Sequence, residues 1–278
     1  LVVMIVALIS SGLVYGTPVW PVTHHVLGAI NGSFTLPLII IVIFYAGELV
    51  WRERTHQSAE VSDAFPVPDW VSLLSKLGAL LAIIVLMLLI GAVLGMGWQL
   101  AHGYTHLEPG LYLGMLALNA IPFVLMAVLA LFLPVASNNK FFGYLLNIIW
   151  VVASTLGFSL LHWEHNLYNY GSTPGVPYSD MNGFGHFIVG ALWFDVYWGC
   201  LAVALLVLSA LLWVRGTGQS WRDRLHEARV RARPPLAALL AAALLAFLGL
   251  GGWIFYNTNV LNHYENSTAQ KREQADYE

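Results

Sequence analysis

Long apolar runs separated by short polar segments dominate this chain. A helix that crosses about 30 Å of hydrocarbon needs about 20 mostly apolar residues. Seven runs approach or meet that length, which predicts an all-α polytopic transmembrane bundle of about seven spans. The predicted spans are Leu1–Tyr15, Phe34–Val50, Leu77–Gly97, Leu111–Val135, Phe141–Leu161, Val196–Val214 and Leu236–Tyr256. The pattern also allows the sixth span to begin near Phe187.

The composition supports this interpretation. Charged residues make up only 10% of the 278 residues, and the mean hydropathy is +0.70. Backbone polar groups must be satisfied internally in a bilayer, so a spanning chain forms helices or a closed barrel, and runs of this length favour helices. The first run is short and begins with Leu1 rather than Met, so we expect the natural chain to extend upstream.

Positive charges are confined to alternate segments between the spans. Segments 51–76, 134–140 and 215–235 hold ten Lys and Arg residues, whereas segments 16–33, 98–110 and 162–186 hold none. Cytoplasmic loops are enriched in Lys and Arg, so the first three segments are predicted to be cytoplasmic. This places the N-terminus inside and the C-terminus outside.

Two further features narrow the function classes. The net charge is −3 and the basic residues lie on one predicted side of the membrane, so nucleic acid is not an expected partner. The single Cys200 lies in an apolar run and excludes a disulfide framework or a cysteine-rich metal site.

The second span ends in a charged elbow. Glu48 precedes Arg52 by four residues, the spacing at which a helical ion pair is favourable. One interpretation is an interfacial anchor in which Trp51 and the arginines reach the headgroups. The other is a coupling elbow that, with residues 55–70, contacts a cytoplasmic partner. The candidate coupling residues are Glu48, Arg52, Glu53 and Arg54.

The last cytoplasmic loop carries six arginines and a helical pattern. Trp221, Leu225, Ala228 and Ala232 recur at helical spacing, which predicts a short basic amphipathic helix. We expect it to lie on anionic lipid, and favour this over a surface for docking a partner.

The predicted outer side holds eight of the ten histidines. Segment 162–186 is dense in turn formers and aromatic residues, which predicts an ordered cap. His162 and His165 are one helical turn apart, as are His102 and His106, a spacing that suits a shared metal but more often reflects ordinary hydrogen bonding. The candidate cap, metal or substrate residues are His162, Glu164, His165, Asp180, His186 and Asp195.

Asp195 carries a charge next to an apolar run. A carboxylate deep in hydrocarbon is costly and usually functional. Val196–Val214 is long enough to span alone, so we expect Asp195 at the outer interface and Phe187–Phe194 lying flat or dipping in as a re-entrant piece. Asn119 and Asn147 fall in mid-span, where hydrogen bonds between helices are the default prediction.

Several catalytic motifs are absent from the sequence. It has no G-x-x-x-x-G-K-[ST] loop, no H-E-x-x-H and no G-x-S-x-G. We therefore expect that this chain neither binds ATP by that route nor acts as an enzyme by itself.

Five sequence runs resemble the second permease half of bacterial ABC-transporter permease–zinc aminopeptidase fusion proteins. These runs are Pro21–Thr23, Phe44–Arg54, Pro66–Trp70, Asn139–Lys140 and Tyr178–Gly185. The resemblance implies a six-span domain over residues 1–235, like a type-2 exporter permease, in which 162–195 is a re-entrant outer element. It implies that residues 236–278 form an added span and a linker to an outer zinc aminopeptidase domain that is not included here.

The resemblance also implies partners and a location. The implied location is the bacterial inner membrane. The implied partners are its lipid bilayer, a separate cytoplasmic ABC ATPase that binds the ATP, and a second permease half or a second copy of this chain. The catalytic zinc would lie beyond Glu278.

Two other classes remain open from the residues themselves. Outer histidines together with eleven Trp residues also fit a haem- or metal-handling membrane protein. An intramembrane metalloprotease that uses His162, Glu164 and His165 is the weakest alternative, because no general-base motif accompanies them.

Overall fold

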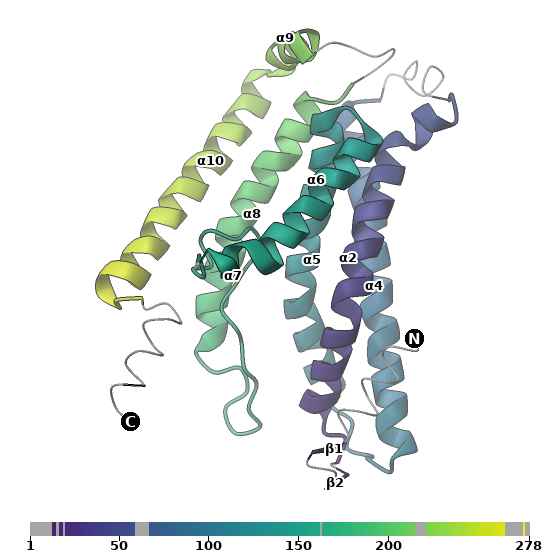
Figure 1. Ribbon diagram of the computed structural model, residues 1–278, viewed down its shortest axis with the longest axis vertical. Helices are drawn as coiled ribbons and strands as arrows, with labels where there is room; N and C mark the ends of the chain where they lie inside the picture. The colour runs from purple at the N-terminus through teal and green to yellow at the C-terminus, as the bar shows by residue number, and fades with distance from the viewer. Residues whose placement is uncertain are drawn as a thin grey trace.

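The computed structural model describes residues 13–14, 17–18, 20–58, 67–161, 163–214, 221–264 and 275 (Figure 1). The long helices are α2 (Thr23–Thr55), α4 (Asp69–Ala101), α5 (Pro109–Ser137), α6 (Lys140–Val152), α8 (Phe187–Leu211) and α10 (Pro234–Phe255). The shorter elements are β1 (Leu13–Val14), β2 (Thr17–Pro18), the π-helix η1 (Ala153–Gly157), α7 (Phe158–Leu160), α9 (Trp221–Arg231) and the π-helix η2 (Tyr256–Leu261).

Six helices of the described chain are long and apolar enough to cross a membrane, with η1 extending α6 and η2 extending α10. The protein is therefore a helical membrane protein, as the apolar runs predict. The first predicted span falls on residues 1–12, which lie outside the described residues. Its predicted end is wrong, because Leu13–Val14 form a strand that pairs with Thr17–Pro18 instead of continuing a helix.

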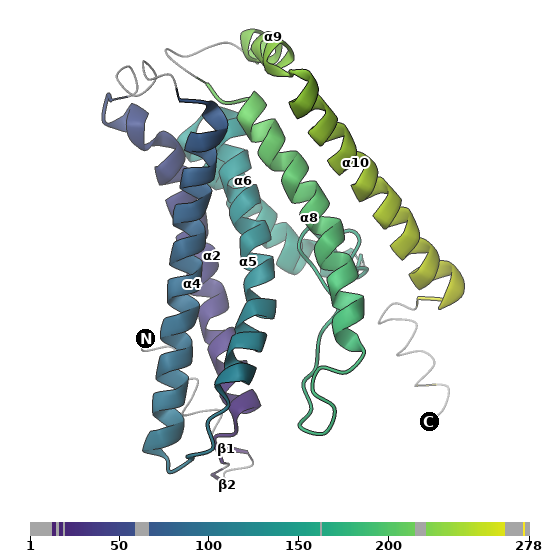
Figure 2. The ribbon, with the colours of Figure 1, turned by 180° about the vertical axis from the view of Figure 1, so that it is seen from behind.

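The helices run alternately up and down, so that polar segments collect at two ends (Figures 1 and 2). The ends of α2, α5 and α8, the starts of α4, α6 and α10, and all of α9 gather at one end, which we call the basic end. Arg52, Arg54, Lys76 and Lys140 all lie there or within two turns of it. This arrangement is the one that the distribution of Lys and Arg requires, and its assignment to the cytoplasm remains a prediction.

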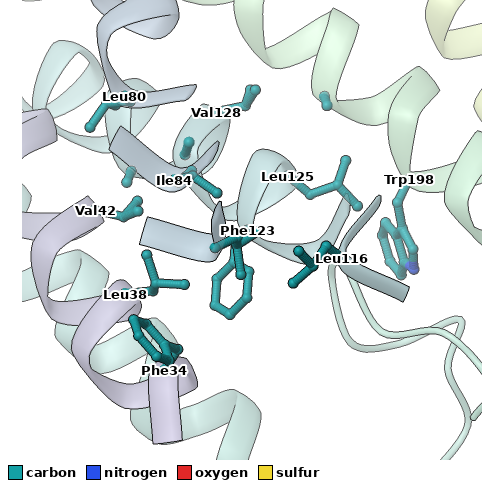
Figure 3. Packing of buried hydrophobic residues seen from close by; sticks show 14 of the residues in the cluster. Phe34, Leu38, Val42, Leu80, Ile84, Leu116, Phe123, Leu125, Val128 and Trp198 are labelled. Atoms are coloured by element: carbon teal, nitrogen blue, oxygen red, sulfur yellow. The ribbon is translucent and has the colours of Figure 1, made fainter. Parts of the chain in front are cut away.

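The core lies where α2, α4 and α5 meet, and Trp198 brings α8 against it (Figure 3). α2 and α4 approach closely at Gly91 and Gly95, a G-x-x-x-G pair. A Cβ on Gly95 would lie 2.8 Å from the Ile30 side chain and 2.9 Å from that of Val26. Small residues allow helix backbones to approach in membranes, where packing rather than hydrophobic burial drives association.

α6 is held by an even closer contact with α5. A Cβ on Gly143 would lie 2.6 Å from the Cα of Pro134. The opposite face of α6, which includes Phe141, Leu145 and Ile149, is exposed and suits contact with lipid. α10 packs on α8, where Phe247 stacks on Tyr197 with ring centroids 4.4 Å apart.

α8 is continuous from Phe187 to Leu211, so the earlier start of the sixth span is correct. The expectation that Phe187–Phe194 form a separate flat or re-entrant piece is wrong, because these residues are the first turns of the same helix. At 1.5 Å per residue, Asp195 lies about 24 Å along α8 from Leu211. This puts it near the far side of a hydrocarbon layer about 30 Å thick.

The contact between α5 and α6 predicts an intolerant glycine. Gly143→Ala should lower stability by about 1–3 kcal/mol, because the new methyl group meets backbone that cannot rotate away. The measurement is the thermal midpoint of the purified protein in detergent. Gly199→Ala is the matched control, since a Cβ there meets nothing within 4 Å. Equal midpoints for the two variants would contradict the close contact.

Candidate functional site

A cavity of about 280 Å³ lies between α2, α5, η1 and the non-helical segment that follows α7. Its polar lining residues are Asn31, Thr35, Asn119, Ser154, Thr155 and Tyr170. Its apolar lining residues are Ile39, Pro122, Phe123, Met126, Trp150 and Val151, with Gly171. Thr35 and Thr155 are exposed and mark its opening between α2 and α6.

The cavity lies at membrane depth. Along α2, Ile39 and Asn31 are about 13 and 25 Å from Glu48 at the basic end, at 1.5 Å per residue. With Glu48 at one interface, the cavity occupies the half of the hydrocarbon layer farther from the basic end. Among the described residues, no Asp, Glu, Lys, Arg or His lines it.

Two amide side chains at this cavity lack hydrogen-bond partners within the described part of the protein. They are Asn31 in α2 and Asn119 in α5. An unsatisfied amide in an apolar medium costs several kcal/mol, so these groups need water or a ligand in the cavity. Asn147 behaves differently: its amide donates to the carbonyls of Ala130 in α5 and Gly143 in α6. The predicted contact between helices is confirmed for Asn147 and wrong for Asn119.

Irregular helix geometry shapes the walls. Pro122 has no N–H, so it cannot donate to the carbonyl of Leu118 beside Asn119. In the opposite wall, Ser154 and Thr155 belong to η1, and both hydroxyls donate back to the carbonyl of Val151. Single-turn π-helices within α-helices often mark functional sites because they re-aim the side chains that they carry.

The fourth wall is a stretch of the 163–186 segment that lies inside the bundle. The Tyr170 hydroxyl donates to the carbonyl of Leu125, in the middle of α5, at 3.0 Å. The Asn169 amide donates to the carbonyl of Ser154, and the Trp198 indole donates to that of Ser172. Non-helical backbone is tolerated at this depth only when protein buries it or it lines a cavity. The predicted ordered segment is present, but this part lies between the helices rather than outside them.

His165 holds this segment to α10. Its Nδ1 accepts the backbone N–H of Leu167 at 3.1 Å, so the ring proton is on Nε2, which lies 3.1 Å from the hydroxyl oxygen of Thr258 in η2. Tyr264 meets the ring edge to face at 4.6 Å. Burial lowers the pKa of His165, which favours the neutral ring that these bonds require. Both nitrogens therefore serve the fold in this arrangement.

The other predicted outer residues are scattered rather than convergent. Asp180 lies at an exposed turn with its carboxylate 4.0 Å from His24 Nδ1. His186 precedes α8 and packs its ring on Phe187. Asp195 is half-buried in the third turn of α8, Glu164 is partly exposed, and His162 lies outside the described residues. In the described ranges, no three His, Cys, Asp or Glu side chains are grouped as a metal site would need.

At the basic end, three of the four predicted coupling residues bond to other parts of the fold. Glu48 pairs with Lys140 of α6 rather than with Arg52, so the expected pair along the helix is wrong. Glu53 accepts from the buried Lys76 of α4 at 2.8 Å. Arg54 donates to the Asn138 side chain and to the carbonyl of Val214. Arg52 is exposed, and it is the one of these four residues that forms no ion pair or side-chain hydrogen bond with the described residues.

α9 forms where a basic amphipathic helix is predicted, its expected contact with anionic lipid stays a prediction, and Arg224 holds the helix to the bundle. Arg224 is only 2% exposed and donates to the carbonyls of Val135, Ala136 and Leu212, at the ends of α5 and α8. Burial and the nearby charge of Arg54 lower the pKa of Arg224. Trp221 and Leu225 are exposed instead. The helical pattern identifies the element correctly, whereas unfilled carbonyls at two helix ends decide which face turns inward.

Comparisons with protein-family models, with curated proteins and with solved structures found no match to this chain. The cavity and the basic end are therefore interpreted from their own geometry.

His165 predicts a pH dependence of stability. Its lowered pKa means that the unfolded chain binds a proton more readily than the folded one, so stability is full above about pH 6.5 and falls as the pH decreases. We expect the thermal midpoint of the protein to drop between pH 7 and pH 5. His165→Gln should lower the midpoint at pH 7.5 and flatten this slope.

His102→Gln is the control, because His102 is exposed. It should keep the pH slope of the unmodified protein. An unchanged slope in His165→Gln would show that His165 is not the titrating group.

Proposed function

We propose that this chain is a permease-like subunit of a membrane transporter, and that the cavity receives the polar part of its substrate. The observation that carries the proposal is the pair of unpartnered amides, Asn31 and Asn119, facing an open cavity at membrane depth. A protein built only to anchor another domain has no need to keep such groups unsatisfied. The uncharged lining suits a neutral group that forms hydrogen bonds.

The basic end supports coupling to a cytoplasmic partner. Arg52 is exposed among side chains that are otherwise engaged within the fold, which leaves it available to a docking protein. We propose an ABC ATPase as this partner, from the resemblance of residues 44–54 to permease sequences. We also propose that the basic end and the N-terminus lie on the cytoplasmic side of the membrane.

The remaining parts of the proposal rest on the resemblance alone. They are the division into residues 1–235 and 236–278, a second permease half or a second copy of this chain, the bacterial inner membrane, and a zinc aminopeptidase domain after residue 278. Two residues of the proposed re-entrant element support it: the Tyr170 hydroxyl donates to the carbonyl of Leu125 in the middle of α5, and a Cβ on Gly171 would lie 3.8 Å from the Leu125 side chain.

The cavity predicts a pattern of thiol accessibility. After Cys200→Ser, a cysteine placed at Asn119 or Ser154 should react with a small water-soluble methanethiosulfonate, because thiolates form only where water reaches them. Mass spectrometry of protein in vesicles measures the modified fraction. Val152→Cys is the matched control, two residues before Ser154 on an exposed face of α6, and it should react at least tenfold more slowly. Equal rates at positions 152 and 154 would remove the basis of the transport proposal.

If Arg52 docks the ATPase, binding of the ATPase and thermal stability should respond to different substitutions. Arg52→Ala should leave the thermal midpoint unchanged and abolish copurification of an ATPase from native membranes. Glu53→Gln should lower the midpoint by several degrees, because it removes the carboxylate from Lys76, whose side chain is 8% exposed. Arg222→Ala, another exposed arginine at the basic end, is the control and should keep the ATPase. Retention of the ATPase by Arg52→Ala would argue for a lipid anchor instead.

A further inference from the structure

A second hollow, distinct from the cavity, lies at the basic end. It is a groove of about 690 Å³ between the start of α4, the end of α8 and the turn from α9 to α10. Its walls include Trp70 from α4, Leu211 from α8 and Leu236 from α10. The groove lies where the apolar spans end, which is the depth of lipid headgroups.

The charges in the groove favour an anion. Its ionisable lining residues are Asp69, Arg231 and Arg233, and the nearby acids Asp69 and Glu227 both pair with Arg231 rather than with Arg233. Arg231 is engaged by Glu227 at 2.9 Å and by Asp69 at 3.5 Å. Arg233 is exposed and forms no ion pair or side-chain hydrogen bond with the described residues, so its guanidinium is available.

Apolar surface lies directly beside that guanidinium. Ala210 and Leu211 of α8, Val230 of α9 and Leu236 of α10 line the same groove. Trp70 is 53% exposed at the first turn of α4, in the position that Trp favours at membrane interfaces. An occupant that satisfies both parts carries one anionic group and an adjoining hydrocarbon chain.

We propose that this groove binds one anionic phospholipid, with its phosphate on Arg233 and an acyl chain between α8 and α10. Basic pockets between spans recognise lipid headgroups in this way. The surrounding bilayer supplies the ligand, because Leu239, three residues after the groove residue Leu236 in α10, is exposed where lipid would lie. A soluble phosphate would use Arg233 but leave the apolar walls uncovered. The inference is independent of transport.

The test uses the purified protein in a neutral detergent after delipidation. Phosphatidylglycerol, phosphatidylcholine with the same acyl chains, and water-soluble glycerol phosphate are each added, and native mass spectrometry counts the molecules retained. We expect one tightly held phosphatidylglycerol, at least tenfold weaker binding of phosphatidylcholine, and no retained glycerol phosphate. Equal retention of the two lipids, or retention of glycerol phosphate, would overturn the proposal.

Two variants and one control locate the site. Arg233→Gln should weaken binding of phosphatidylglycerol about tenfold, and Ala210→Phe should block it by filling the apolar part of the groove. Arg229→Gln is the control, because Arg229 is exposed on α9 but does not line the groove. If Arg229→Gln weakens binding as much as Arg233→Gln, the attraction is a general effect of the basic surface and the site is refuted.

Discussion

The absence of water from the hydrocarbon layer is the constraint on which this structure depends. Every backbone polar group at that depth must find its partner within the protein, which is why the spanning elements are helices. The same lack of water favours the hydrogen bonds of residues 169–172: the Asn169 and Tyr170 side chains donate to carbonyls of η1 and α5, and the Ser172 carbonyl accepts from Trp198 of α8. Without those bonds, this non-helical stretch would not be stable beside the middle of α5. Close helix packing at Gly95 and Gly143 completes the frame.

The cavity differs from the rest of the bundle because two polar side chains that line it find no such partner within the described residues. The bundle also contains Asn147, whose amide N–H groups donate to the carbonyls of Ala130 and Gly143 while its Oδ1 is buried without a partner in the described residues. Asn31 and Asn119 lie deeper, in the half of the layer farther from the basic end, and have no hydrogen-bond partner within the described residues. The open polar space beside Asn31 and Asn119 is the basis on which we propose an occupant for the cavity. The π-helical turn and Pro122 help to hold the walls apart.

The sequence predicts the long helices well, because apolar length reports directly on spanning. The sequence does not predict which side chains contact one another across the fold. The spacing of Glu48 and Arg52 allows a pair along α2, but Lys140 of a neighbouring helix takes Glu48 instead. The spacing of His162 and His165 is compatible with a metal, yet the contacts of His165 with Thr258 and Leu167 depend on residues distant in sequence or on loop geometry. The G-x-x-x-G pair at Gly91 and Gly95 was a readable signal of close packing.

Arg224 has a mechanical consequence. Its guanidinium ties α9 to the carboxyl ends of both α5 and α8. A displacement of α9 would therefore act on α5 and α8 together. One of them, α5, carries Asn119 in the cavity wall about 24 Å from Val135 along its axis, at 1.5 Å per residue. Arg224 thus connects the short helix at the basic end to the helix that carries part of the cavity wall.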